Sequence, residues 1–196
     1  MSKAEKTKIK IVSAAHKLIK LQGFEATHIK QICEEAGVAY RTFYMYFPSK
    51  ESVITTLFFQ IDLFNPEAFS GLLIADGTWN KLWKAYSMLI DKTIEIGPEI
   101  CARIFICLLG NPETRAYAKP IKHVDILEPL IKHAQEQGEI LIKGDHQQIC
   151  RSSMDFVCGV YFRWAMKLED FDLHMELRKN LENYFQVRDD LRKTKN

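Results

Sequence analysis

The feature that most constrains the fold is an Ala-Gly-Val bend at residues 36–38, set between two short apolar-periodic segments. Apolar residues recur at helical spacing over 28–35 and again over 39–46. A glycine accepts the positive φ that such a tight bend needs. A longer amphipathic segment over 4–22, followed by Gly23, predicts a supporting helix. Together these segments predict a helix-turn-helix unit packed on a first helix.

The rest of the chain is also helical in pattern. Thr27 is the predicted N-cap of the segment 28–35, and Ser49 is the predicted N-cap of a fourth helix that runs to about residue 64. Longer periodic segments follow at 79–96, at 99–109, near 117–137, after Asp145 and after Asp172. Asp145 and Asp172 are the predicted N-caps of the last two helices. No segment sustains the alternation of a strand. We therefore expect an all-α fold of about nine helices.

Composition and charge narrow the class of protein. The chain is 47% hydrophobic and 27% charged, as in ordinary globular proteins. The N-terminus lacks the apolar core of a signal peptide, and the most apolar run, 100–110, is too short to span a bilayer. We expect a cytoplasmic protein with no membrane segment. Residues 1–50 hold nine basic and four acidic side chains, a net charge of +5, which suits a surface that binds a polyanion.

The segment 39–46 has two dissimilar faces. Phe43 and Phe47 are four residues apart and are expected to point inward together. Aromatic and basic side chains remain for the other side: Tyr40, Arg41 and Tyr44, with Thr42 and Tyr46 flanking them. A solvated helix face normally carries Glu, Lys and Gln instead. This outward set predicts a surface that meets another molecule.

Double-stranded DNA fits this surface. A short helix can enter the major groove, where an Arg such as Arg41 can bridge guanine O6 and N7. Tyr and Thr hydroxyls can donate to phosphate oxygens. Thr27 with His28, and Ser49 with Lys50, stand at predicted helix N-termini, whose free N–H groups attract phosphates.

Residues 9–54 resemble the N-terminal domain of the tetracycline-repressor (TetR) family of transcriptional regulators. The shared motifs are AA at 14–15, G-F-x-A-T at 23–27, I-x-x-I-C at 29–33, A-G-V at 36–38 and T-F-Y-x-Y-F-x-S-K-E at 42–51. The resemblance implies a DNA-binding domain at 5–65, with its helix-turn-helix near 28–47, and a ligand-binding and dimerisation domain at 66–196. It also implies a homodimer that pairs through its last two helices and binds a small-molecule effector.

The resemblance assigns roles to particular positions. Phosphate contacts are implied for Thr27, Tyr44, Tyr46 and Lys50, and groove contacts are implied for Tyr40, Arg41 and Thr42. Three positions depart from the family pattern: Ala39 replaces a capping Ser, Arg41 replaces a frequent Gly, and Met45 replaces a polar or basic residue. These departures favour an unusual operator sequence.

No motif marks the effector pocket that the resemblance implies. Candidates are large side chains that exceed what a core needs: Phe58, Trp79, Trp83, Tyr86, Phe105, Met154 and Tyr161. Packing in the core is the alternative for each of them. Arg103 interrupts an apolar helix, and its charge needs either an acidic side chain or an anionic ligand. The apolar stripes of the last two helices favour a homodimer, although burial within one subunit would also satisfy them.

Two other functions compete with DNA binding. An all-α enzyme would need a Cys or His nucleophile beside an orienting acid, and the sequence offers no such set. The five cysteines are expected to be reduced thiols, and the histidines lack the spacing of metal ligands, so we expect neither metal nor cofactor. A protein-interaction module with a tyrosine face is the second alternative. The sequence favours a ligand-responsive repressor that is not an enzyme.

Overall fold

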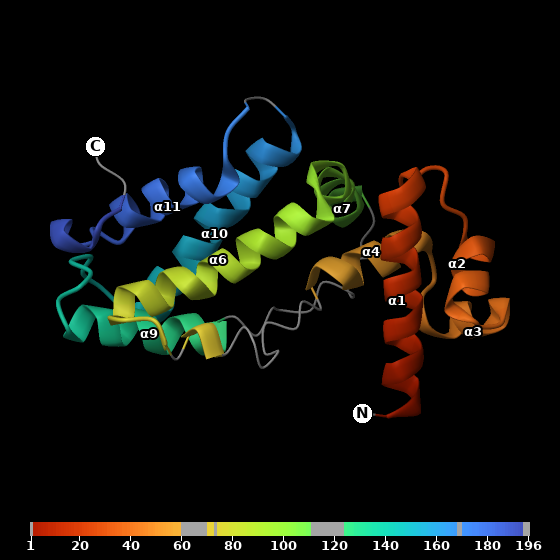
Figure 1. Cartoon of the computed structure of the whole chain (residues 1–196), viewed down its shortest axis with the longest axis horizontal. Coiled ribbons are helices and arrows are strands. Elements are labelled where there is room, and N and C mark those ends of the chain that lie inside the picture. Colours follow the sequence, from red (N-terminus) through yellow and green to blue (C-terminus); the bar gives the residue numbers. More distant parts are fainter. Residues whose placement is uncertain (1, 60–69, 73, 111–123, 168–169, 194–196) are drawn as a thin grey trace. The chain divides into compact units, whose positions relative to one another are not determined.

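The computed structural model describes residues 2–59, 70–72, 74–110, 124–167 and 170–193 (Figure 1). These residues form nine α-helices and one short 3-10 helix, and within them no strand forms beyond an isolated bridge between Ile140 and Val187. The predicted all-α class is confirmed. None of the helices in these ranges is long and apolar enough to cross a membrane.

The chain divides into two compact units, residues 1–61 with 99–120 and residues 62–98 with 121–196. The division predicted from the sequence, 5–65 and 66–196, does not group 99–120 with the N-terminal helices. The predicted assignment of 5–65 to DNA binding and of 66–196 to ligand binding and dimerisation stays a prediction.

The first unit contains the predicted helix-turn-helix. Its helices are α1 (Lys3–Gln22), α2 (Ile29–Ala36), α3 (Tyr40–Tyr46), α4 (Lys50–Phe59) and α7 (Pro98–Gly110). Helix α1 packs against α2 and α4, and α3 packs against α2 (Figure 1). Ile11, Ile32 and Ile54 are fully buried, one each on α1, α2 and α4, so this small core fixes the base on which α3 rests.

The second unit contains α6 (Thr78–Ile96), α9 (Val124–Glu136), α10 (His146–Ala165), α11 (Leu173–Tyr184) and the 3-10 helix Asp189–Leu191. Helix α9 packs against α6 and α10, and α11 packs against α6 and α10 (Figure 1). The predicted N-caps of α10 and α11 are confirmed: Asp145 accepts a hydrogen bond from Gln148 N at 2.9 Å, and Asp172 accepts one from Met175 N at 2.7 Å. The predicted helical stretch 117–123 lies outside the described residues.

The N-terminal cap of helix α6 comes from a residue that the local sequence does not predict. Gly77 precedes it and has no side chain to cap the helix, with φ 77° and ψ 154°. The carboxylate of Glu139 accepts hydrogen bonds from Thr78 N (3.1 Å) and Trp79 N (2.5 Å) instead. A residue 60 positions further along the chain thus satisfies the free N–H groups at this helix start.

Candidate nucleic-acid interface

The turn between α2 and α3 has the geometry predicted from Gly37. This glycine is left-handed, with φ 64° and ψ 39°. Gly37 N donates to Glu34 O at 3.2 Å, and Val38 N donates to Cys33 O at 3.0 Å. These two bonds form a Schellman motif, which ends α2 and fixes the direction in which α3 begins. Any other residue at position 37 would strain this backbone.

The inward face of α3 is as predicted. Phe43 and Phe47 have no exposed surface, and their ring centroids lie 6.0 Å apart. Ala39 is the N-cap of α3 and makes no side-chain hydrogen bond, which confirms that the helix lacks a side-chain cap. A seven-residue helix is unstable alone, so its position depends on these two anchoring rings.

The outward face of α3 is aromatic and basic. Tyr40 is 53% exposed, Tyr44 is 45% exposed, and Arg41 is exposed as well. Arg41 makes no hydrogen bond or ion pair within the described part of the chain, so its guanidinium is available to a ligand. Thr42 and Tyr46 are half-buried at the flanks. The structure therefore brings five of the predicted DNA-binding residues together on one short helix.

Tyr40 and Tyr44 contact each other through both their rings and their hydroxyl groups. Their rings meet edge to face with centroids 5.2 Å apart, and their hydroxyl oxygens lie 3.4 Å apart. Tyr44 also packs edge to face on Phe43, at 5.4 Å between centroids. The hydrogen bond with Tyr40 raises the pKa of the Tyr44 hydroxyl. A tyrosine hydroxyl can donate a hydrogen bond to a phosphate or a base.

The start of α2 differs from the prediction. Thr27 is not the N-cap: His28 is, and its backbone N donates to Gln31 Oε1 at 2.8 Å. Thr27 is fully buried, and its hydroxyl donates to Gly23 O at 2.8 Å. This inward bond closes the loop after α1 and leaves Thr27 without exposed surface for a phosphate. His28 is exposed beside the helix start, where a phosphate could approach.

Lys50 is held at the other flank of the helix-turn-helix. Its Nζ donates to Phe24 O at 2.6 Å and to Thr27 O at 2.7 Å, and it lies 4.0 Å from the centroid of the Phe24 ring. Burial lowers the pKa of this amine. Next to it, Ser49 Oγ accepts from Ser52 N at 3.3 Å, which confirms Ser49 as the cap of α4. In this geometry Lys50 organises the loop, and its phosphate contact stays a prediction.

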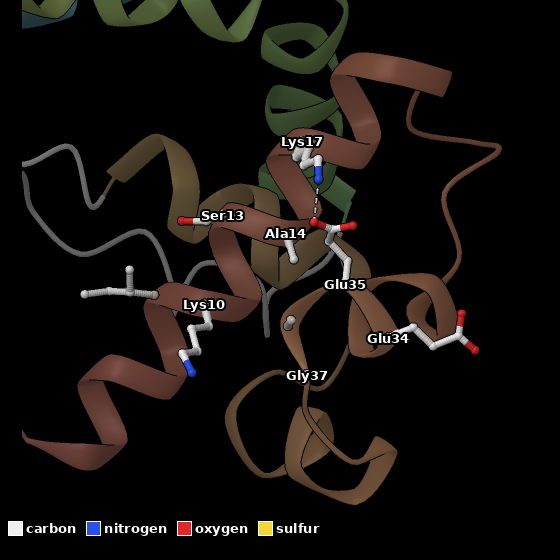
Figure 2. Close-up of a pocket in the computed structure, with 9 residues that line it drawn as sticks. Lys10, Ser13, Ala14, Lys17, Glu34, Glu35 and Gly37 are labelled. Atoms are coloured by element: carbon white, nitrogen blue, oxygen red, sulfur yellow. Dashed lines mark hydrogen bonds and ion pairs between the residues drawn. The ribbon is translucent and has the colours of Figure 1, made fainter.

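A groove of about 520 Å³ runs along α1 beside the helix-turn-helix (Figure 2). Its polar lining carries both charges: Lys10 and Lys17 on α1, and Glu34 and Glu35 at the end of α2. Lys17 faces Glu35 in Figure 2, with 2.6 Å between Nζ and Oε1. Because the charges balance, the groove is not an anion site. An exposed pair of this kind contributes about 0–1 kcal/mol to stability.

The predicted effector residues are divided between the two units. Phe58, Arg103 and Phe105 belong to the first unit, while Trp79, Trp83, Tyr86, Met154 and Tyr161 belong to the second. Nothing is described of the Phe58 side chain, whereas Phe105, Trp83 and Met154 are half-buried. Trp79, Tyr86 and Tyr161 are buried in the second unit. The Tyr86 and Ser153 hydroxyl oxygens lie 2.6 Å apart, and the rings of Trp79 and Tyr86 pack on Phe185 at 5.9 and 6.1 Å between centroids.

Arg103 has an acidic partner. Its guanidinium forms an ion pair with the carboxylate of Glu25, in the loop after α1, and lies 5.1 Å from the centroid of the Phe24 ring. Of the two predicted alternatives, the acidic side chain is the one that the structure shows, and a ligand contact of Arg103 stays a prediction. The sequence could not distinguish the two, because the pair joins residues 78 positions apart.

Most of the thiols are buried. Cys33, Cys101, Cys107 and Cys150 are buried, and Cys158 is exposed. Burial raises the pKa of Cys33, of Cys107 and of Cys150, the last to about 11. A thiol that stays protonated at neutral pH is a poor nucleophile. Across the described ranges, no group of three or more His, Cys, Asp or Glu side chains is placed to hold a metal ion.

The fold and the outward face of α3 define a helix-turn-helix protein with a larger helical body. Residues 11–56 match the family model described as bacterial regulatory proteins, tetR family. An HTH-type transcriptional regulator of Bacillus subtilis strain 168, YvdT, is 31% identical over 101 residues. That match spans 52% of this chain and 50% of the relative, about half the length of each.

Solved structures share the whole fold. FadR of Thermus thermophilus, a TetR-family transcriptional repressor in complex with lauroyl-CoA, has a TM-score of 0.71 at 24% identity, covering 93% of this chain and 96% of that one. FadR of Bacillus subtilis, in complex with stearoyl-CoA, has a TM-score of 0.60 at 22% identity, covering 90% and 97%. The predicted resemblance is confirmed: residues 11–56 match the model of the tetR family, and the chain shares the fold of TetR-family structures.

Proposed function

We propose that this protein is a ligand-responsive transcriptional repressor that binds a palindromic operator as a homodimer. The outward face of α3 carries the proposal, because Tyr40, Arg41 and Tyr44 are exposed on a helix that two buried rings hold in place. Arg41 contacts a guanine edge, and the tyrosine hydroxyls with Thr42 fix the register on the backbone. His28 and Lys50 add phosphate contacts at the flanks.

An exposed stripe on α10 supports the homodimer. Cys158, Phe162 and Met166 recur every four residues, with Gly159 beside them, and all four are exposed. Phe162 and Met166 are 44% and 47% exposed, and Met175 on α11 is 70% exposed. A second copy that covers this stripe would bury apolar surface and bring two helix pairs together. Gly159 at its centre lets helices approach closely.

The buried aromatic cluster of the second unit supports a small-molecule effector. Trp79 Nε1 is a buried donor that has no hydrogen-bond partner in the described part of the chain. Such a donor costs free energy unless something accepts its hydrogen. An effector that enters beside Trp79, Tyr86 and Tyr161 would supply the acceptor. Since two proteins with this fold are complexed with lauroyl-CoA and stearoyl-CoA, long-chain acyl-CoAs are the first class to test.

Selection of bound duplexes from a random pool tests this function. We expect palindromic winners with half-sites about one helical turn apart, and an affinity that falls steeply with salt. Light scattering should show a dimer, and Met166→Glu should weaken it more than Glu136→Lys, an exposed change on α9. Added acyl-CoA should release the selected duplex. Failure to enrich any sequence at low salt would contradict DNA binding, whereas an enriched duplex that no acyl-CoA releases would reject only this effector class.

A further inference from the structure

Met45 is the residue of α3 whose position the packing does not explain. Its side chain is 73% exposed, more than that of Tyr40 or Tyr44. The inward face of the helix is already filled by Phe43 and Phe47. A single exposed apolar side chain is common and needs no explanation by itself. Met45 differs because it stands on α3 among the exposed residues for which DNA contacts are proposed.

The outward face of α3 consists of two parallel rows. Tyr40 and Tyr44, four residues apart, form the first row and are locked by their ring contact. Arg41 and Met45, also four residues apart, form the second row, and both are exposed. Side chains at this spacing lie about 5–6 Å apart on a helix surface. Successive bases on one DNA strand are about 3.4 Å apart, so the second row spans roughly two base steps.

The two members of this second row differ in what they can recognise. Arg41 can donate two hydrogen bonds to guanine O6 and N7. Met45 has no hydrogen to donate, and its thioether is only a weak acceptor. Among the groups that base pairs present in the major groove, the C5-methyl of thymine is the apolar one. A flexible thioether side chain is well suited to cover a methyl group.

We propose that Met45 is a specificity-determining residue that contacts the 5-methyl group of a thymine within two base pairs of the guanine bound by Arg41. The inference rests on the proposed function, since it requires α3 to lie in the major groove. Each half-site then contains a G and a T at this separation. The thymine is recognised by its methyl group and not by its hydrogen-bonding edge.

Uracil substitution tests the contact, because deoxyuridine differs from thymidine only by that methyl group. Each thymine of a selected duplex is replaced singly, and Kd is measured by anisotropy for the wild type, Met45→Leu and Met45→Gln. One thymine per half-site should be sensitive: losing its methyl weakens wild-type and Met45→Leu binding about fourfold. Met45→Gln, of similar length but polar, should bind both duplexes equally.

The outcomes separate the two proposals. If no thymine is sensitive, or if Met45→Gln is as sensitive as the wild type, the methyl contact is overturned while operator binding stands. If no duplex is selected at all, the proposed function fails and this inference fails with it. Thermal unfolding shows whether Met45→Gln folds, and Met45→Ser provides a second polar variant. A sensitive thymine more than two base pairs from the guanine lost in Arg41→Ala also contradicts the proposal.

Discussion

Aromatic side chains are exposed on α3 of the first unit and buried on α6 of the second unit. In the first unit, Tyr40 and Tyr44 are 53% and 45% exposed on a seven-residue helix. In the second unit, Trp79 and Tyr86 are fully buried on a 19-residue helix that α9 and α11 cover. The difference shows that residue type alone does not locate a binding surface. What matters is whether other residues of the same helix already fill its inward face.

The largest expected effect is a loss of folding stability that differs between substitutions on the inward and outward faces of α3. Phe43→Ala removes a fully buried ring and should lower the free energy of unfolding of the first unit by about 3–5 kcal/mol. Tyr44→Ala, next to it but half exposed, should cost less than about 1.5 kcal/mol, since only its ring contacts are lost. Urea denaturation monitored by circular dichroism measures both. Equal losses would mean that α3 is not anchored as described.

A smaller loss of stability is expected in the second unit when the cap that Glu139 provides for α6 is removed. Glu139→Ala leaves two N–H groups at the start of α6 without their acceptor and should cost about 1–2 kcal/mol. Glu136→Ala is the control, because the contact of this exposed carboxylate with His133, at 3.5 Å, is itself exposed. Thermal unfolding should place the control close to the wild type. A Glu139→Ala protein as stable as the control would contradict the capping role.

The smallest effect concerns the hydroxyl pair on the outward face. The hydrogen bond between the Tyr40 and Tyr44 hydroxyls raises the pKa of Tyr44 above its ordinary value, so its contribution is present at neutral pH and is lost as pH rises through that raised pKa. Tyr40→Phe should return the Tyr44 pKa toward the ordinary value. NMR titration of ring-labelled tyrosine measures it, with Tyr46→Phe as the control. An unchanged Tyr44 pKa in Tyr40→Phe would show that the two hydroxyls do not interact.

Sequence reasoning succeeds here where the determinants are local. Gly37, the Phe43–Phe47 spacing and the caps Asp145, Asp172 and Ser49 act within a few residues of their position, and each is confirmed. The class of fold follows from such signals, because the apolar period of a helix is visible in its own sequence.

The misses involve both near and distant partners. Thr27 donates to Gly23 O, four residues away, instead of capping α2. The sequence left the partner of Arg103 open, and the structure pairs it with Glu25, 78 positions away. The cap that Glu139 provides for α6 has no signal in the residues around Gly77. Likewise, aromatic residues of the second unit look alike in sequence whether they pack a core or line a pocket. Only the packing of α6 against its neighbours distinguishes those that are buried.

The affinity of Arg41→Ala for a selected duplex tests the central claim most directly, namely that the outward face of α3 contacts bases. Lys20→Ala is the matched control, since Lys20 is an exposed basic residue near the end of α1. At fixed salt, Arg41→Ala should lose about 1–3 kcal/mol of specific binding and tolerate changes at one guanine per half-site, while affinity for random duplex falls little. Unchanged affinity and unchanged base preference in Arg41→Ala would contradict the account.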